Sequence, residues 1–205
     1  MKKLRTVVLL LVFISPAVLA NAEQTLRTKL QAISQFSADF SQTVVSPDGK
    51  VIHQAYGHLV IAKPGKLHWQ VMRPNHDEII SNGQTIWYYS PIVEQVSIYN
   101  TSDAIVHTPF ILLADQRPST WVGYKVSATK QKYTVTSTHD SQQPAFTVQF
   151  DSKDHINEFD VIDNQGQRSE FKLSHFNAKP NIAAGEFSFA IPSGTEIDDQ
   201  RQPHE

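Results

Sequence analysis

The sequence contains no cysteine among its 205 residues. This absence excludes disulfides, thiolate metal sites, iron–sulfur clusters, cysteine nucleophiles and a lipid-bearing N-terminal cysteine. The sequence also lacks a cluster of Lys and Arg after residue 20, and without a basic face a nucleic-acid partner is not expected. Only one apolar run approaches the length that spans a membrane, and it lies in the first 20 residues.

These first 20 residues have the pattern of a secretory signal peptide. They comprise three basic residues, an apolar run and a group of small residues, namely Lys2, Lys3 and Arg5, then 6–14, then 17–20. The apolar stretch is shorter than the roughly 20 residues of a transmembrane helix. The sequence therefore predicts a signal peptide over 1–20, with cleavage after Ala20 or Ala22, and one soluble domain over 21–205 outside the cytoplasm.

The domain is predicted to be mainly β, with a few short helices. Leu26, Leu30 and Ile33 recur at helical spacing and predict one amphipathic helix over 23–35. Beyond this point the apolar period changes to two, which is typical of strands. The predicted strands are 36–41, 51–62, 67–72, 78–81, 84–89, 93–99, 124–127, 133–136, 145–150, 156–162, 169–176 and 187–191. They are too numerous for one flat sheet, and favour a curled antiparallel meander.

Two local signals refine this reading. Asn82 and Gly83 lie between apolar runs and predict a two-residue type I′ turn, which needs positive φ at both positions. Thr108 precedes Pro109 as an expected N-cap, so a helix is predicted over 110–115. This helix is apolar over most of its circumference, which is expected of a helix that covers a curled sheet.

Alternation within the strands predicts one apolar face. Leu59 and Ile61 share a face, as do the apolar residues of the next strand, and Trp87 and Tyr89 share a face further along the chain. A curled sheet encloses its apolar face. Such a face forms either an ordinary filled core or a cavity for an apolar ligand, and periodicity does not separate the two.

Motifs for chemistry are weak. The nine histidines do not form a metal-binding motif, although His58 and His68 share an outward parity on neighbouring strands. The S-x-x-K matches at Ser127 and Ser169 fall at strand ends or within strands, where lysine does not reach serine. The sequence therefore predicts no catalytic residue, no metal site and no cofactor.

A set of segments in order along the chain resembles the periplasmic outer-membrane lipoprotein carrier family, the LolA type. These segments are 36–42, 57–59 with Lys63, Pro64 and Trp69, 81–89 with Pro91 and Gln95, 108–113, and 187–189 with Pro192, Gly194 and 198–201. Each is weak alone, but together they span nearly the whole mature chain. The resemblance implies an unclosed antiparallel β-barrel covered by a helical lid over a hydrophobic cavity.

The resemblance also implies a function. A carrier of this type is a periplasmic monomer that holds acylated lipoproteins by their acyl chains and catalyses no reaction. It accepts them from an inner-membrane ATP-binding-cassette release complex and delivers them to an outer-membrane acceptor lipoprotein. The residues implied to line the acyl-chain cavity are Phe36, Phe40, Leu59, Ile61, Leu67, Trp69, Val71, Trp87, Tyr89, Phe110 and Leu113.

The family latches its lid with a basic residue just before the proline that follows the second long strand, and here that residue is Lys63. Arginine is common at this position. Because lysine has three donors on a flexible stem whereas arginine has five in a rigid fork, we expect a weaker closed state here. Leu67, four residues on, takes the place of a bulky residue at the cavity mouth, or is a plain core leucine.

The alternatives to a carrier are another secreted protein that binds apolar ligands and a small outer-membrane β-barrel. A membrane-anchored acceptor of the same fold needs a cysteine at its cleavage site, and this chain has none. Polar outward faces and the apolar helix over 110–115 argue against the membrane barrel.

Overall fold

A computed structural model describes residues 17–101, 112–114, 121–138 and 144–201. Its single described α-helix, α1, spans Ala17–Ala32, and Leu26 and Leu30 on it are buried. It begins within the predicted signal peptide and ends three residues before the predicted limit, because the chain is already extended from Gln35 onward. Cleavage after Ala20 leaves most of this helix on the mature chain, including both buried leucines.

The strands form one continuous sheet. Their bounds are β1 Gln35–Val45, β2 Val51–Ala62, β3 Lys66–Arg73, β4 Glu78–Asn82, β5 Thr85–Ser90, β6 Gln95–Asn100, β7 Tyr124–Thr129, β8 Lys132–Ser137, β9 Ala145–Phe150, β10 Ile156–Ile162, β11 Arg168–Asn177 and β12 Glu196–Asp199. The order across the sheet is β12-β6-β5-β4-β3-β2-β1-β11-β10-β9-β8-β7. Every neighbouring pair is antiparallel except β12 with β6.

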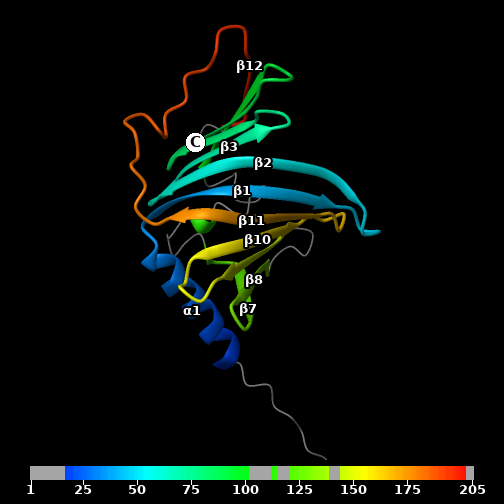
Figure 1. The fold of residues 1–205 in the computed structure, drawn as a ribbon, viewed down its shortest axis with the longest axis vertical. Helices are drawn as coiled ribbons and strands as arrows, with labels where there is room; N and C mark the ends of the chain where they lie inside the picture. Colours follow the sequence, from blue (N-terminus) through cyan, green and yellow to red (C-terminus); the bar gives the residue numbers. More distant parts are fainter. Residues whose placement is uncertain (1–16, 102–111, 115–120, 139–143, 202–205) are drawn as a thin grey trace, which may run out of the picture.

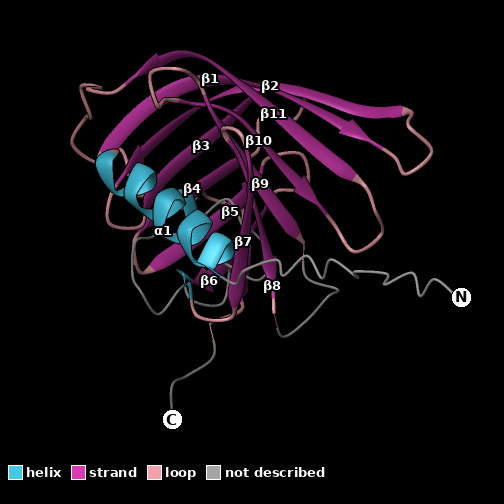
Figure 2. Ribbon diagram, turned by 90° about the horizontal axis from the view of Figure 1, so that it is seen from below, coloured by secondary structure: helices cyan, strands magenta, loops and turns pink. Residues whose placement is uncertain are grey.

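The sheet curls but does not close. Its end strands, β7 and β12, do not pair with each other in the described part of the chain. Figures 1 and 2 show the long central strands arching over a concave side, with α1 lying against that side. The architecture is thus an unclosed, predominantly antiparallel β-barrel with a covering helix, as the sequence indicated.

The main core lies between the concave face and its helical cover. Leu26 and Leu30 of α1 pack in one buried cluster with side chains from strands in both halves of the sheet. Leu112, Leu113 and Ala114 belong to the same cluster. Thus the described piece of the predicted helix over 110–115 is buried as expected. Its remaining residues, Phe110 included, lie outside the described residues.

Two local predictions were wrong. Residues 187–191 do not form a strand, because their backbone pairs with no other strand. Phe187 and Phe189 are apolar at alternate positions because their rings pack on neighbouring side chains. The strand that follows, β12, was not predicted.

At Asn82-Gly83 only Gly83 has a positive φ, of 97°, so the turn is not type I′. Asn82 instead accepts hydrogen bonds at Oδ1 from the backbone N–H groups of Gln84 and Thr85, both at 2.9 Å.

Candidate functional site

The apolar residues of β1, β2 and β3 form three rows across the concave face. Pairing aligns Phe36 with Ile61 and Leu67, aligns Ala38 with Leu59 and Trp69, and aligns Phe40 with Gly57 and Val71. Since directly opposed residues point to the same side of a sheet, the seven predicted cavity residues from these strands share one surface. Leu113 joins the same buried cluster.

Trp69 is the centre of this surface. Its ring stacks on Phe40 at a centroid distance of 4.0 Å and meets the edge of Phe171 at 5.2 Å. Phe159 lies 6.0 Å from Trp69 and stacks on Phe171 at 4.6 Å. β10 and β11 therefore contribute two aromatic residues that the sequence analysis did not assign to the site, although both occupy apolar positions in predicted strands.

An open pocket of about 340 Å³ adjoins this aromatic group. Its wall is partly apolar and partly polar, and consists of Gln42, His53, Ala55, Trp69, Val71, Asn75, Asp77, Ile79, Tyr88 and Phe171. Its volume is near the lower end of the range for small-molecule sites, about 300–1,000 Å³. Beside this pocket, Phe40, Trp69 and Phe171 pack on one another and occupy part of the concave face in the described part of the chain.

Trp87 and Tyr89 do not belong to this surface, which corrects their assignment to the cavity. Trp87 pairs with Ile80, and Ile80 pairs with His68, so these residues lie on the convex face. There Phe189 of the C-terminal segment approaches Trp87 at 6.5 Å and Tyr89 at 5.5 Å. The inward residues of β5 are Ile86 and Tyr88 instead.

A second apolar cluster explains why these aromatics face outward. Val60, Ile80, Val96 and Ile98 are buried on the convex side of strands β2, β4 and β6, beneath the C-terminal segment. This half of the sheet is apolar on both faces. Parity along one strand therefore does not reveal which face meets α1, and the face follows only from the pairing between strands.

The turn between β2 and β3 joins the two parts of the helical cover. Lys63 donates a hydrogen bond from Nζ to the backbone carbonyl of Leu30 in the last turn of α1. The Lys63 N–H donates to the carbonyl of Ser34 at 2.9 Å, and the Gly65 N–H donates to the carbonyl of Ala114 at 3.0 Å. Lys63 and Gly65 of this turn thus hold both the end of α1 and the segment that contains Leu113.

Burial lowers the pKa of Lys63 from 10.5 to about 8. Its ammonium is still predominantly charged at neutral pH, and a cation at a helix C-terminus interacts favourably with the free carbonyl groups there. However, none of the carboxylates in the described part of the chain forms an ion pair with it. The contact with α1 is therefore a hydrogen bond from a desolvated ammonium group to an uncharged backbone carbonyl.

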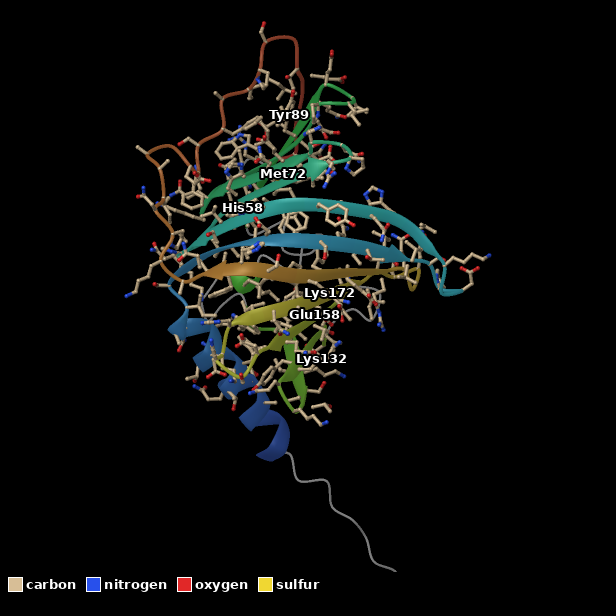
Figure 3. The ribbon with its side chains drawn as sticks, viewed as in Figure 1. His58, Met72, Tyr89, Lys132, Glu158 and Lys172 are labelled. Atoms are coloured by element: carbon tan, nitrogen blue, oxygen red, sulfur yellow. The ribbon has the colours of Figure 1, made fainter. Side chains whose placement is uncertain are left out.

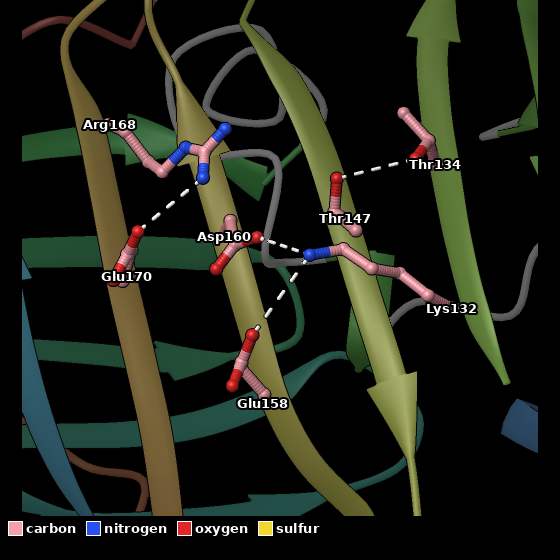
Figure 4. Close-up of polar contacts among 7 residues, drawn as sticks. All are labelled: Lys132, Thr134, Thr147, Glu158, Asp160, Arg168 and Glu170. Carbon is pink, nitrogen blue, oxygen red and sulfur yellow. Dashed lines mark hydrogen bonds and ion pairs between the residues drawn. The ribbon is translucent and has the colours of Figure 1, made fainter. Parts of the chain in front are cut away.

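The convex face of β8 to β11 is polar. Lys132 Nζ lies 2.9 Å from Asp160 Oδ2 and 4.0 Å from Glu158 Oε1, and Arg168 Nη1 lies 3.5 Å from Glu170 Oε1 (Figure 4). Figure 3 shows Lys132, Glu158 and Lys172 together on this side. An apolar ligand would find a suitable surface on the concave side and not here.

Three histidines of the described part of the chain contact carboxylates. His58 Nδ1 contacts Asp39 Oδ1 at 2.7 Å, whereas His68 Nδ1 contacts Glu186 Oε1 at 2.8 Å, so the two belong to different carboxylates. His175 Nδ1 contacts the other oxygen of Asp39 at 2.8 Å. The His58 hydrogen bond, followed by that of His175, lowers the Asp39 pKa against an opposing effect of burial. Over the described ranges, three or more metal-type ligands never gather at one point.

The α-helix in the described part of the chain does not have the length and apolar character needed to cross a membrane.

Comparison with known proteins identifies the chain's relatives. The outer-membrane lipoprotein carrier protein of Psychromonas ingrahamii is 43% identical over 205 residues, covering 98% of this chain and all of the relative. That of Aeromonas salmonicida is 42% identical over 202 residues, with the same coverage. A crystal structure of an uncharacterized conserved protein from Thermus thermophilus has a TM-score of 0.52 at 9% identity, covering 88% of this chain and 99% of that one, and so shares the fold alone.

The profile of one family, described as outer membrane lipoprotein carrier protein LolA, matches residues 31–190. This range includes all of β1 to β11, the Lys63 turn and residues 178–190, which follow β11. Together with relatives about 40% identical over nearly their full length, it establishes that the chain belongs to the LolA family of outer-membrane lipoprotein carrier proteins.

Proposed function

We propose that this protein is a periplasmic chaperone that carries lipoproteins by sheltering their acyl chains between the concave face of the sheet and α1. One observation carries the proposal. An apolar surface that includes Phe40, Leu59 and Trp69 shares one buried cluster with α1, the helix that the Lys63 side chain holds through a hydrogen bond to Leu30. The relatives are named as carriers of outer-membrane lipoproteins, which supplies the cargo.

Loading requires the cover to move. The free pocket of about 340 Å³ is small, and Trp69, Phe40 and Phe171 fill the space beside it. Release of the Lys63 contact would let α1 and the Leu112–Ala114 segment separate from the sheet. The apolar side chains that pack on each other in the closed state would then pack on acyl chains. Closure when the carrier is empty keeps this surface from water.

Shelter of the acyl chains must also be incomplete. Each buried methylene contributes roughly 0.8 kcal/mol, so complete burial of several long chains would exceed about 20 kcal/mol, near the limit of non-covalent affinity. A carrier that bound so tightly would not release its cargo. Extraction from a bilayer costs a similar amount, so the energy for loading comes from outside the carrier.

The partners follow from this role. An inner-membrane ATP-binding-cassette release complex supplies the lipoprotein, and an outer-membrane acceptor lipoprotein receives it. Residues 1–20 direct secretion, and residues 21–205 act as one monomeric carrier domain. The protein binds and transfers without catalysing a reaction.

The test is to purify the mature chain from periplasm while lipoprotein release from the inner membrane is active. The proposal expects a soluble one-to-one complex with an acylated protein, and expects cargo that lacks its acyl chains not to co-purify. Absence of acylated protein from the purified carrier under these conditions would overturn the proposal.

A further inference from the structure

A second pocket lies outside the lipid-binding surface, at the junction between the latch turn and the C-terminal segment. It has a volume of about 590 Å³ and lies between residues 182–188 and the turns at Lys63 and Asn82. The residues around it are Ala62, Lys63, Lys66, Asn82, Gln84, Ile182, Ala183, Gly185, Glu186, Phe187 and Ser188. Lys63 therefore belongs to this pocket and also contacts α1.

Two lysines, Lys63 and Lys66, and one carboxylate, that of Glu186, line the pocket. Lys66 has its Nζ 5.9 Å from the Phe187 ring centroid and, like Lys63, forms no ion pair with a carboxylate of the described residues. Glu186 also lines the pocket, but its carboxylate contacts His68 Nδ1 at 2.8 Å. With two lysines and one carboxylate, the pocket lining carries an excess of positive charge, whereas the mature chain has a predicted net charge of −5.

Neutral donors complete the surroundings. The side chain of Asn82 accepts two backbone hydrogen bonds at Oδ1, which leaves its Nδ2 group to donate. Gln84 and Ser188 also line the pocket. Two ammonium groups beside amide and hydroxyl donors suit a compact oxyanion such as phosphate, which presents several acceptor oxygens.

We propose that this pocket binds a phosphate-bearing anion, either a phospholipid headgroup or free phosphate, and that the bound anion draws Lys63 away from the Leu30 carbonyl. The second half of the proposal rests on the carrier function proposed above, because it regulates opening of the same cover. Anion binding itself requires no cargo.

The chemistry of Lys63 connects the two events. Its ammonium has three donors, and in the described part of the chain Nζ makes only the bond to Leu30. A charged phosphate oxygen is a stronger acceptor for a buried ammonium than a peptide carbonyl is. Occupation of the pocket therefore favours a Lys63 position that no longer holds α1. If the anion is a lipid headgroup, the carrier would open at an anionic membrane surface and remain closed away from it.

The first experiment titrates inorganic phosphate into the cargo-free mature protein by calorimetry, with Lys66→Gln as the test variant and Lys172→Gln as the control. Lys172 is an exposed lysine on β11, on the polar convex face (Figure 3). We expect Lys66→Gln to weaken phosphate binding about tenfold, as loss of a charged hydrogen bond does, and Lys172→Gln to have no effect. Equal affinity in the two variants, or no binding by wild type to phosphate or vesicles, overturns the proposal.

The second experiment separates the source of the anion from the response of the latch. Flotation with phosphatidylglycerol vesicles that depends on Lys66, and does not occur with phosphatidylcholine vesicles, identifies a lipid headgroup. Binding of phosphate without vesicle binding identifies the free anion. In either case hydrogen exchange at residues 30–34 must accelerate when the pocket is occupied. Anion binding without this acceleration overturns the coupling to Lys63 while leaving the carrier function intact.

Discussion

Lys63 donates a hydrogen bond from its Nζ to the backbone carbonyl of Leu30, and so joins the end of β2 to the last turn of α1. The two residues lie 33 positions apart in the sequence. The neighbouring Gly65 N–H holds the carbonyl of Ala114 at 3.0 Å, so one short turn contacts both parts of the cover. Both contacts of this turn have to break before the two parts of the cover can leave the concave face.

Substitution of Lys63 should shift the balance between the closed and open states. Lys63→Met keeps the apolar stem but removes the donor, and we expect the open population to rise about tenfold, near the lower end for loss of a charged hydrogen bond. Removal of the buried charge offsets part of the effect. Lys63→Arg should slow opening, because the guanidinium can bridge more than one carbonyl. Hydrogen exchange over residues 22–32 measures both changes.

Lys172→Met is the control for these variants, because it removes an exposed lysine on the opposite side of the sheet. If Lys63→Arg left both opening and ligand transfer unaltered, the assignment of Lys63 as the latch would be wrong.

The closed state should become more stable as the pH rises above about 8. Burial lowers the pKa of Lys63 to about 8 in the closed structure, whereas a solvated lysine keeps a value near 10.5. Between these values the open or unfolded chain binds the proton more fully than the closed chain, so raising the pH favours closure. Below pH 8 both states are protonated and this dependence disappears.

The measurement is fluorescence of a dye that binds exposed apolar surface, recorded from pH 7 to 10.5. Dye binding to wild type should fall through this range relative to Lys63→Met and Lys63→Arg, which carry no titrating group at the position. A parallel fall in all three proteins would assign the effect to other groups.

Gly57 is required beside Phe40. The two residues are opposed in the β1–β2 pairing, and a Cβ at position 57 would lie well inside van der Waals contact with the Phe40 ring and the Gln70 carbonyl oxygen. Gly57→Ala should therefore destabilise the protein by about 2 kcal/mol through overpacking. Denaturant unfolding measures the loss. Phe40→Leu in the same chain should recover part of it, and a double variant as unstable as the sum of the two single variants would refute this explanation.

The Lys132 and Asp160 pair stabilises the convex face. Asp160 is only 4% exposed, and Lys132 contacts its Oδ2 at 2.9 Å while Oδ1 is buried without a partner. Lys132→Met should lower the free energy of unfolding by about 2 kcal/mol, because it leaves a buried carboxylate unpaired. The loss stays below that of a fully buried pair because Lys132 is partly exposed. Unfolding of the double variant Lys132→Met/Asp160→Thr should recover most of this loss. A single variant as stable as wild type would contradict the argument.

Much of the fold could be predicted from the sequence because strand alternation is a local property. β2, β9 and β10 begin and end at the predicted residues, and Lys63-Pro64-Gly65 forms the turn between β2 and β3. The prediction failed at 187–191, where apolar alternation reflects packing of Phe189 against Trp87 and Tyr89 instead of strand pairing.

The candidate site was predicted in part for a related reason. Alternation places Trp69 with Leu67, and separately Trp87 with Tyr89, but it does not relate the faces of strands that are separated by turns. Ile79 pairs with both Trp69 and Tyr88, so these residues share the concave face, and Trp87, next to Tyr88, lies on the convex face. A sheet with apolar residues on both faces cannot be oriented from polarity alone.

Photocrosslinking from positions 69 and 87 shows which face of the sheet the acyl chains contact. Both residues are tryptophans, and only Trp69 lies on the concave face. With p-benzoylphenylalanine at either position, and a lipoprotein carrying radiolabelled acyl chains as cargo, we expect labelled crosslinks from position 69 and none above background from position 87. Crosslinks of equal yield at both positions, or from position 87 alone, would contradict it.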